Sequence, residues 1–276
     1  MESLFKLSEK GTSVKVELRA GLATFLTMAY IIVVNPDILS ATGMSFSGVL
    51  FATVLVSAVS SILMGLVANL PFALAPGMGI NALFSYTIVL GMGVAWQTAL
   101  GAVFISGIVF ILLSVFKVRE AIVRAIPTSL RYGVAAGIGL FLAVIGLTNV
   151  GFIVVDAGTP VAFGGLNTQT ILFVVGLIIT SVLVIRKVKG ALIYGIVGTS
   201  IIALVTSLIV EASGGEAFMS VPDRIFALPT FEVFFKLDIL GALSLGMILP
   251  IFTLLFTDMF DSISTFVGVS EVGGFI

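Results

Sequence analysis

The stretch Leu70-Pro-Phe-Ala-Leu-Ala-Pro-Gly-Met-Gly-Ile-Asn-Ala-Leu-Phe-Ser-Tyr86 is apolar, yet it cannot form one unbroken helix. It holds two prolines and two glycines within nine residues; proline lacks a backbone donor, and glycine costs about 1 kcal/mol relative to alanine. The helix is therefore predicted to begin near Gly79 or Asn81. Irregular backbone at membrane depth is tolerated where it lines a cavity, and discontinuous helices mark transporter sites. The alternative is a loop that leads into a shorter helix.

The chain as a whole has the composition of a membrane protein. Of its 276 residues, 59% are hydrophobic and 10% are charged, with a mean hydropathy of +1.28. A spanning helix needs about 20 mostly apolar residues. The sequence therefore predicts an all-α, polytopic membrane protein with about eight transmembrane segments. They are expected at 19–36, 47–69, 73–92, 97–116, 128–150, 169–186, 190–210 and 243–270.

The basic residues indicate how the chain is oriented, because lysine and arginine are enriched in cytoplasmic loops. With a cytoplasmic N-terminus, only Arg224 and Lys236 fall on the outer side, and every other basic residue falls inside. A missed or additional span would disrupt this distribution. The pattern predicts a multi-pass protein whose N-terminal tail, 1–16, is cytoplasmic.

The composition also excludes several kinds of chemistry. The net charge is −1, which leaves no basic surface for nucleic acid. There is no cysteine and no histidine, so disulfides, thiolates, histidine-ligated metals and histidine-based triads are absent. No metal or cofactor is expected, any proton carrier must be a carboxylate, and an enzyme is not predicted.

Two aspartates, Asp258 and Asp261, lie inside the last apolar segment. A carboxylate near the middle of a bilayer costs about 2.5 kcal/mol or more, so such residues mark solute or proton sites. Three residues apart, they lie on nearly one face of a helix. The alternative is that either one accepts hydrogen bonds from a neighbouring helix in a structural role.

Two further regions contain features that are more ambiguous. Thr27 and Tyr30 place hydroxyls in the first span, where hydroxyls serve packing more often than binding. The glycines of 133–139 form a small-residue ridge that predicts close helix contact. Segment 119–126 is expected along the cytoplasmic interface, and the phenylalanine-rich outer loop, 211–242, is expected to contain an interfacial helix.

Three motifs carry a resemblance to a known family. They are Thr27-Met-Ala-Tyr-Ile-Ile-Val-Val-Asn-Pro36, Ala75-Pro-Gly-Met-Gly-Ile-Asn-Ala82 and Phe256-Thr-Asp-Met-Phe-Asp-Ser-Ile-Ser-Thr265. In this order they resemble the AzgA-like guanine, hypoxanthine and adenine permeases of the nucleobase-ascorbate (xanthine/uracil permease) superfamily. The resemblance runs along the whole chain.

The resemblance implies a fold of fourteen segments built as two inverted seven-segment repeats, in which a substrate-binding core domain moves against a gate domain. Residues 17–210 would form the first repeat, and 243–276 would be the first segment of a second repeat that is largely missing. The chain is thus expected to be an N-terminal fragment. The implied full-length protein is a homodimer in the plasma membrane.

The resemblance also implies a site that binds a purine nucleobase. Asp261 would hold the base, and Asn81 would lie beside it at the third-segment motif. The candidate substrate-binding residues are completed by Gly79, Ile80, Tyr30, Phe84 and Thr27. Asp258 would support the site or couple transport to protons. Ser264 departs from the family, whose members usually have glycine there, and is expected to crowd the packing of the eighth segment.

The function predicted is secondary active uptake of guanine, hypoxanthine or adenine by proton symport. One alternative keeps the fold and changes the solute to uracil, xanthine or an inorganic anion, although two carboxylates argue against an anion. Another alternative is a truncated or split half-transporter that moves nothing alone.

Overall fold

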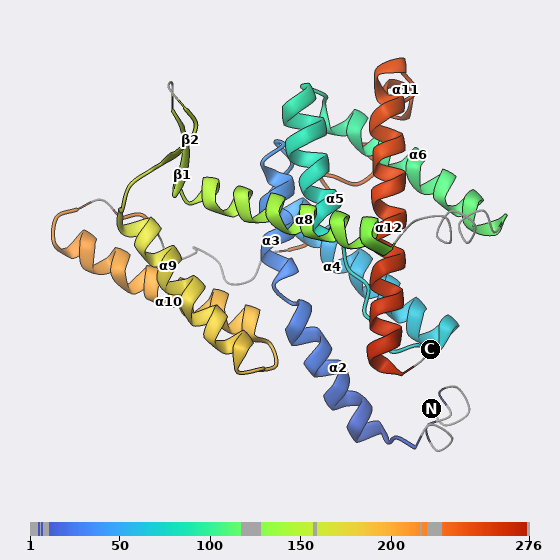
Figure 1. Ribbon diagram of the computed structural model, residues 1–276, viewed down its shortest axis with the longest axis horizontal. Helices are drawn as coiled ribbons and strands as arrows, with labels where there is room; N and C mark the ends of the chain where they lie inside the picture. Colours follow the sequence, from blue (N-terminus) through green and yellow to red (C-terminus); the bar gives the residue numbers. More distant parts are fainter. Residues whose placement is uncertain are drawn as a thin grey trace. The chain divides into compact units, whose positions relative to one another are not determined.

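The computed structural model describes residues 5, 7, 11–116, 128–156, 159–215, 217–219 and 228–274. The chain forms two compact units, each assembled from three separate pieces. The first unit consists of 1–34, 53–75 and 144–229, and the second consists of 35–52, 76–143 and 230–276. Figure 1 shows that helices dominate both.

Helices occur at all eight predicted stretches. They are α2 (Val14–Met28), α3 (Ile31–Ser40), α4 (Phe46–Leu63), η1 (Met64–Ala68), α5 (Met78–Ala82), η2 (Leu83–Gly91), α6 (Trp96–Val115), α8 (Thr128–Asn149), α9 (Thr168–Ile185), α10 (Ala191–Ala212), α11 (Ile239–Ala242), η3 (Leu245–Met247) and α12 (Ile248–Gly273). In the described part of the chain, six helical segments are long and apolar enough to cross a membrane. That the third and fifth stretches also cross it stays a prediction.

The third stretch is broken where its prolines and glycines predicted. Its backbone is not helical up to Gly77, and α5 begins at Met78, one residue before the predicted start. The extended part is held by Ser61 of α4, whose Oγ accepts from the Leu74 N–H at 2.9 Å and donates to the Leu74 carbonyl at 3.2 Å. Beyond α5 the chain continues as the wider π-helix η2, which periodicity did not predict.

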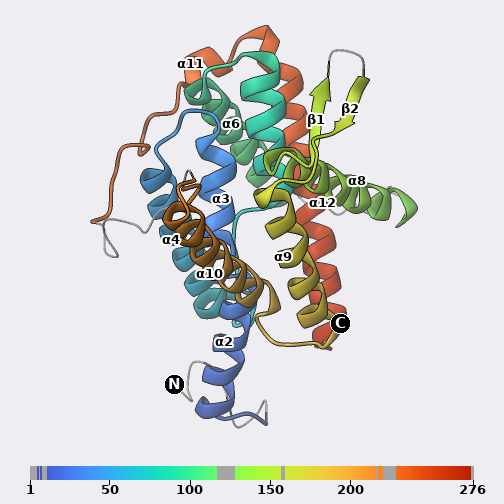
Figure 2. The ribbon, with the colours of Figure 1, turned by 90° about the vertical axis from the view of Figure 1, so that its left-hand side faces the viewer.

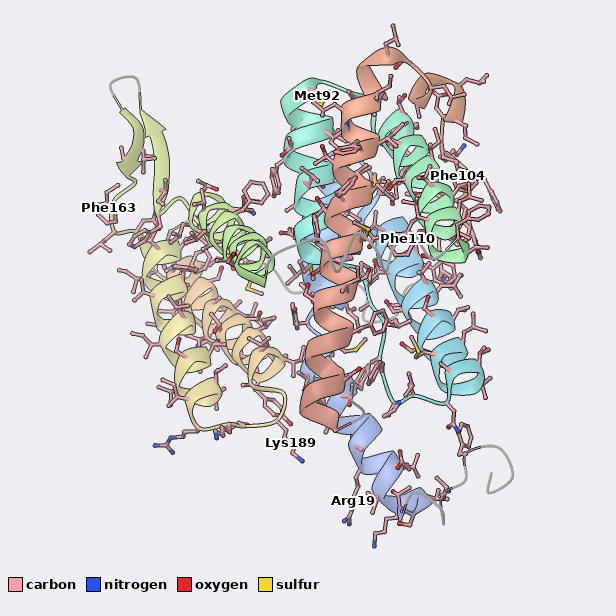
Figure 3. All side chains as sticks on the ribbon, turned by 45° about the vertical axis from the view of Figure 1, so that its right-hand side comes forward. Arg19, Met92, Phe104, Phe110, Phe163 and Lys189 are labelled. Carbon is pink, nitrogen blue, oxygen red and sulfur yellow. The ribbon has the colours of Figure 1, made fainter. Side chains whose placement is uncertain are left out.

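The second unit is built around one apolar core. The core joins the beginning of α4, the helix η2, and α6 to the last segments of the chain, α11 and α12. Its buried members are Met44, Val49, Phe84, Ile88, Val89, Ala99, Ala102, Ala242, Met247 and Leu254. The opposite face of α6 is exposed, as Phe104 illustrates in Figure 3. Because the exposed residues are as apolar as the core, this face suits contact with lipid rather than water.

The end of the outer loop docks on the beginning of α4. The Thr230 hydroxyl donates to the Ser47 hydroxyl at 3.3 Å, and the ring of Phe51 meets that of Phe231 edge-on at 5.0 Å. The side chain of Val233 lies 3.1 Å from the position that a Cβ on Gly48 would occupy. The loop is therefore fixed at the level of this helix end.

The same loop also docks on the beginning of α6, through Asp238. Its backbone N–H donates to the Gln97 carbonyl at 2.9 Å, and its carboxylate accepts from the Thr98 hydroxyl at 3.0 Å. The carboxylate also caps α11 by accepting from the Gly241 N–H at 2.9 Å. The helices α4, α6 and α11 thus begin at one end of the second unit.

In the first unit, α9 and α10 form a helical hairpin, seen in Figures 1 and 2. Two glycines allow close approach: Gly176 faces Thr199, and Gly195 faces Thr180. Each threonine hydroxyl donates to the carbonyl of the glycine on its own helix, at 2.8 Å from Thr180 to Gly176 and 2.7 Å from Thr199 to Gly195. The contact is reciprocal and needs no polar bond between the helices.

Several features differ from the sequence analysis. The fold is not wholly α-helical, because β1 (Ile153–Asp156) and β2 (Thr159–Phe163) form an antiparallel hairpin between α8 and α9 (Figure 2). β-branched residues favour these strands. The first span is interrupted at Ala29 and Tyr30, between α2 and α3.

Three further predictions concern segment 119–126, the outer loop and the glycines of 133–139. Segment 119–126 lies outside the described residues. In the described part of the outer loop, 228–238 contains turns, followed by the four-residue helix α11; an interfacial helix elsewhere in the loop stays a prediction. At Gly133, Gly137 and Gly139, no described atom lies within 4 Å of an added Cβ. Close helix contacts at glycines lie instead at Gly101, where α6 meets α11, and at Gly176 and Gly195 in the α9–α10 hairpin.

Candidate functional site

The second unit brings Asp261 of α12 against the beginning of the broken helix. A Cβ on Gly77 would lie 2.8 Å from the Asp261 Oδ2 atom, so only a glycine allows the carboxylate to come this close. Gly77 is the N-cap of α5, in an extended conformation. The sequence placed these two motifs in one site, and the structure places them in contact.

The surroundings of Asp261 suit a carboxylate that binds a solute or a proton. The first N–H groups of a helix have no partner within it, and the helix dipole adds partial positive charge there. The Asp261 side chain is half-buried, and among the described residues its carboxylate has neither a hydrogen bond nor an ion pair. It is therefore available to a solute or a proton.

Asp258 is placed differently on the same helix. Its carboxylate accepts from the Ser262 hydroxyl at 3.3 Å, one turn further along α12. Met259, one of the two residues between the aspartates, is 1% exposed and packs inward. The two carboxylates therefore flank a buried ridge, and only that of Asp261 meets Gly77 at the start of α5.

Asn81 also has a specific partner. Its Nδ2 donates a hydrogen bond to the Oδ1 of Asn35, which lies on α3 and is 2% exposed. Sequence reasoning did not assign Asn35 to the site. The signal was present, because Asn35 directly precedes Pro36 in the first of the three motifs, but nothing local shows that it meets Asn81.

The remaining candidates of the second unit lie along α5 and η2. Gly79 is in the first turn of α5, and its carbonyl accepts from the Leu83 N–H. Ile80 is partly buried and packs against the core. Phe84 is 3% exposed within that core, beside Ile88 and Val89. Its ring lines the protein interior in this conformation.

Thr27 and Tyr30 belong to the first unit. The Thr27 hydroxyl donates to the Ala23 carbonyl of its own helix at 2.8 Å, which is the packing role expected of most hydroxyls in membrane helices. Tyr30 lies at the interruption between α2 and α3, and its carbonyl accepts from the N–H groups of Val33 and Val34 at 3.1 and 3.0 Å. Thr27 thus lies just before a break in the first span, and Tyr30 lies within the break.

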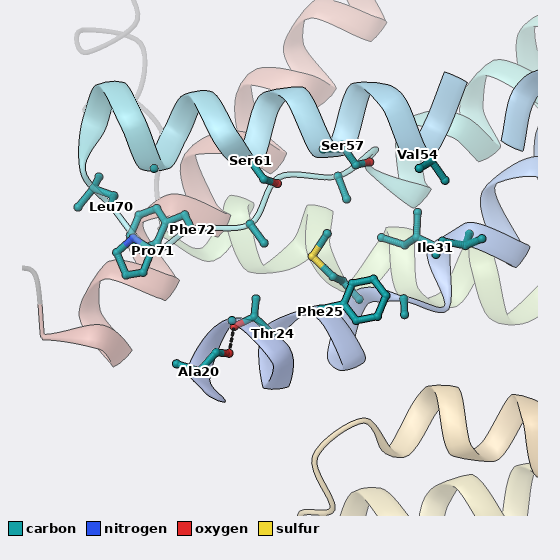
Figure 4. A pocket seen from close by; sticks show the side chains of 18 of the residues that line it. Ala20, Thr24, Phe25, Ile31, Val54, Ser57, Ser61, Leu70, Pro71 and Phe72 are labelled. Carbon is teal, nitrogen blue, oxygen red and sulfur yellow. Dashed lines mark hydrogen bonds between the residues drawn. The ribbon is translucent and has the colours of Figure 1, made fainter. Parts of the chain in front are cut away.

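The first unit also contains a cavity of about 500 Å³, drawn in Figure 4. It lies between α2, α4 and the extended residues 70–75, and its lining is mainly apolar. Of its hydroxyls, that of Thr24 donates to the Ala20 carbonyl at 3.0 Å, whereas Ser57 Oγ is buried without a partner in the described structure. Sequence reasoning missed this cavity, although Ser57 and Ser61 are one turn apart on α4.

Ser264 does not crowd the packing of α12. Its side chain is exposed, and its hydroxyl donates to the Phe260 carbonyl of the same helix. In the described parts of the chain, no group of three or more acidic residues is arranged to hold a metal ion. The candidate site therefore consists of a carboxylate, an amide pair and the start of a helix.

Six helical segments among the described residues are apolar and long enough to cross a membrane, and a broken helix begins against a carboxylate of one of them. These features indicate the class, a multi-pass helical membrane protein. The profile of the Permease family matches residues 15–274. The chain belongs to this family. The resemblance noted in the sequence is thereby confirmed, and the family consists of permeases rather than enzymes.

Curated relatives agree with this assignment. A putative permease of Methanocaldococcus jannaschii is 45% identical over 100% of the chain and 62% of its own length. The adenine permease AdeP of Escherichia coli is 40% identical over 99% of the chain and 60% of its own length. The guanine/hypoxanthine permease PbuO of Bacillus subtilis is 39% identical, with shares of 98% and 62%. The chain thus spans about three fifths of the length of these relatives.

Proposed function

We propose that the protein takes up purine nucleobases (guanine, hypoxanthine or adenine) as a secondary active transporter coupled to protons. The relatives named for adenine and for guanine and hypoxanthine support the solute class. The activity is proposed for the whole protein, since these relatives extend beyond the matched region.

The observation that carries the proposal is the approach of the Asp261 carboxylate to Gly77 at the start of α5. A purine base is flat, uncharged and rich in N–H donors along its edge. A carboxylate accepts such donors in short, strong hydrogen bonds. The Asn81 amide, on α5, offers a second acceptor and a donor. The Asp261 carboxylate and the Asn81 amide therefore suit opposite parts of one base edge.

Proton coupling is proposed for the same carboxylates. With no histidine in the chain, Asp258 and Asp261 are the acidic groups of the last span that can carry a proton. Coupling requires that solute and proton each favour one state of the transporter over the other. Protonation of a carboxylate that also binds the base meets this requirement.

The finer topology is part of the proposal: eight segments of a two-repeat inverted fold, a cytoplasmic N-terminus, the plasma membrane and a homodimer. Within the first unit, Figure 3 shows Arg19 and Lys189 toward the same end, as expected if both lie on the cytoplasmic side. The docking of the outer loop on α4 and α6 supports the alternation of spans in the second unit.

The decisive experiment is Asp261→Asn in the protein expressed from its complete reading frame. We expect saturable uptake of labelled hypoxanthine to be abolished while the amount of protein at the cell surface is unchanged. The matched control is Ser264→Ala on the same helix, which removes an exposed hydroxyl and is expected to leave uptake intact. Retained uptake in Asp261→Asn would refute the role of this carboxylate.

The solute is settled by competition. Unlabelled adenine and guanine are expected to compete with hypoxanthine, and uracil and sulfate are not. Collapse of the proton gradient with a protonophore is expected to stop accumulation without preventing exchange. Accumulation that survives the protonophore would contradict symport and leave the purine specificity standing.

A further inference from the structure

We propose that Asn35 is a positioning residue that fixes the orientation of the Asn81 amide and thereby determines which purine edge the site prefers. The inference rests on the proposed function, since it concerns the recognition of the same solute. It concerns the pairing of two side chains from separate helices, which nothing in the local sequence indicates.

The geometry singles out Asn35. Its side chain is 2% exposed, and it lies on α3 next to the buried Pro36. Its Oδ1 accepts the hydrogen bond from Asn81 Nδ2. A buried amide oxygen that already faces a donor is costly to leave unsatisfied. The bond therefore holds the Nδ2 side of the Asn81 amide toward α3.

The fixed orientation of the Asn81 amide has a chemical consequence, because the oxygen and nitrogen ends of an asparagine amide are not equivalent. The oxygen only accepts, and the nitrogen only donates. With Nδ2 pinned to Asn35, Asn81 retains its Oδ1 as an acceptor and one N–H as a donor, in a fixed order in space. If the amide rotated by half a turn, that order would be reversed.

Purine bases differ in that order. A 6-oxopurine, such as hypoxanthine or guanine, carries a donor at N1 beside an acceptor at O6, whereas adenine carries an acceptor at N1 beside a donor at its 6-amino group. Asp261 supplies a second fixed acceptor, so the base cannot simply turn over to match. A pinned Asn81 therefore favours one of the two classes over the other.

The test compares three variants of the protein expressed from its complete reading frame. Asn35→Leu has a similar volume and no acceptor, and Asn35→Asp keeps an acceptor for the Asn81 N–H. For each, the KM, the maximal rate and the surface amount are measured for hypoxanthine and for adenine. The third variant, Asn81→Leu, sets the level of discrimination that remains without this amide.

We expect Asn35→Leu to raise the KM of the preferred base about 3- to 10-fold, in line with one lost hydrogen bond. Its preference between hypoxanthine and adenine is expected to fall toward that of Asn81→Leu. Asn35→Asp is expected to retain more of the preference than Asn35→Leu. An unchanged preference in Asn35→Leu, with only a lower maximal rate or surface amount, would overturn the positioning role and leave Asn35 as a packing residue.

A double-mutant cycle separates this inference from the proposed function. The thermal midpoints of the wild type, Asn35→Leu, Asn81→Leu and the double variant are measured without any solute. Non-additive shifts support the amide pair, because each single variant already breaks the bond; additive shifts overturn it. If the wild type takes up no purine, the proposed function fails and the discrimination role fails with it, while the cycle still decides whether the two amides are paired.

Discussion

The carboxylate of Asp261 lies so close to Gly77 that a Cβ there would be 2.8 Å from Oδ2. This distance is shorter than ordinary van der Waals contact, so the Asp261 carboxylate must rotate away if residue 77 gains a side chain. The contact joins α12 to the start of the broken helix α5 within the second unit. A substitution at Gly77 therefore tests whether this contact matters for function.

Gly77→Ala is expected to displace the Asp261 carboxylate at little cost to the stability of the second unit, because the end of a flexible side chain can rotate away from the new methyl group. Purine uptake by the complete protein should fall strongly, with a raised KM, because the acceptor leaves its position. The matched control is Gly107→Ala on α6, where no described atom lies within 4 Å of the added Cβ. Equal uptake by both variants would contradict a functional contact between Asp261 and the start of α5.

The α9–α10 hairpin is expected to depend on its two glycines. A Cβ on Gly176 would lie 2.6 Å from Thr199 Oγ1, and one on Gly195 would lie 2.9 Å from Thr180 Cβ. Gly176→Ala and Gly195→Ala are each expected to cost about 1–3 kcal/mol through overpacking. Thermal unfolding in detergent measures the loss.

The control for the hairpin is Gly198→Ala, three residues from Gly195 on the same helix. Nothing described lies within 4 Å of its added Cβ. Because alanine is the better helix former, this variant should hold or raise the thermal midpoint. A midpoint that falls as far as in Gly195→Ala would show that the loss does not come from the contact with Thr180.

Asp238 is expected to hold the end of the outer loop in place. Asp238→Ala removes the acceptor for the Gly241 N–H and the Thr98 hydroxyl, a loss of about 0.5–2 kcal/mol for a helix cap. Hydrogen exchange at residues 239–243 should become faster. The Glu232 side chain, also in the loop, makes no hydrogen bond to these groups in the described structure, so Glu232→Ala should leave the exchange unchanged.

The side chain of Phe235 is expected to insert into the membrane interface. Phe235 is 91% exposed on a turn that is fixed to the beginning of α4, and an exposed apolar ring is more favourably placed in the membrane interface than in water. With Trp96→Phe as the tryptophan-free background, Phe235→Trp should be quenched by brominated lipids in vesicles. Glu232→Trp on the same turn should be quenched mainly by aqueous iodide, and reversed quenching would place the turn outside the interface.

Features encoded over a few residues were predictable. The break before α5 was predicted within one residue, because proline and glycine act on the backbone at their own positions. The eight helical stretches followed from apolar length alone. Asp258 and Asp261 also differ in position, since only the second meets Gly77; the functional roles expected of them stay predictions.

Features that need a distant partner were not predictable. The Asn35–Asn81 hydrogen bond joins residues of different helices, and the sequence around either residue does not identify its partner. The ridge at 133–139 had the expected composition but no described neighbour, whereas the isolated Gly176 and Gly195 each met a threonine. The π-helix η2 escaped because its period differs from the 3.6 residues on which helix recognition relies.

The division of the chain into interleaved pieces determines the order in which the protein can be built. Val49 and Leu254 belong to one core, so the N-terminal half of that core must remain incomplete until the ribosome has produced the last span. The first unit likewise waits for 144–229 to join 1–34 and 53–75. Contacts so distant in sequence fold slowly and leave intermediates exposed. Early spans must therefore be stored in the bilayer, shielded by lipid or by the insertion machinery, before either unit closes.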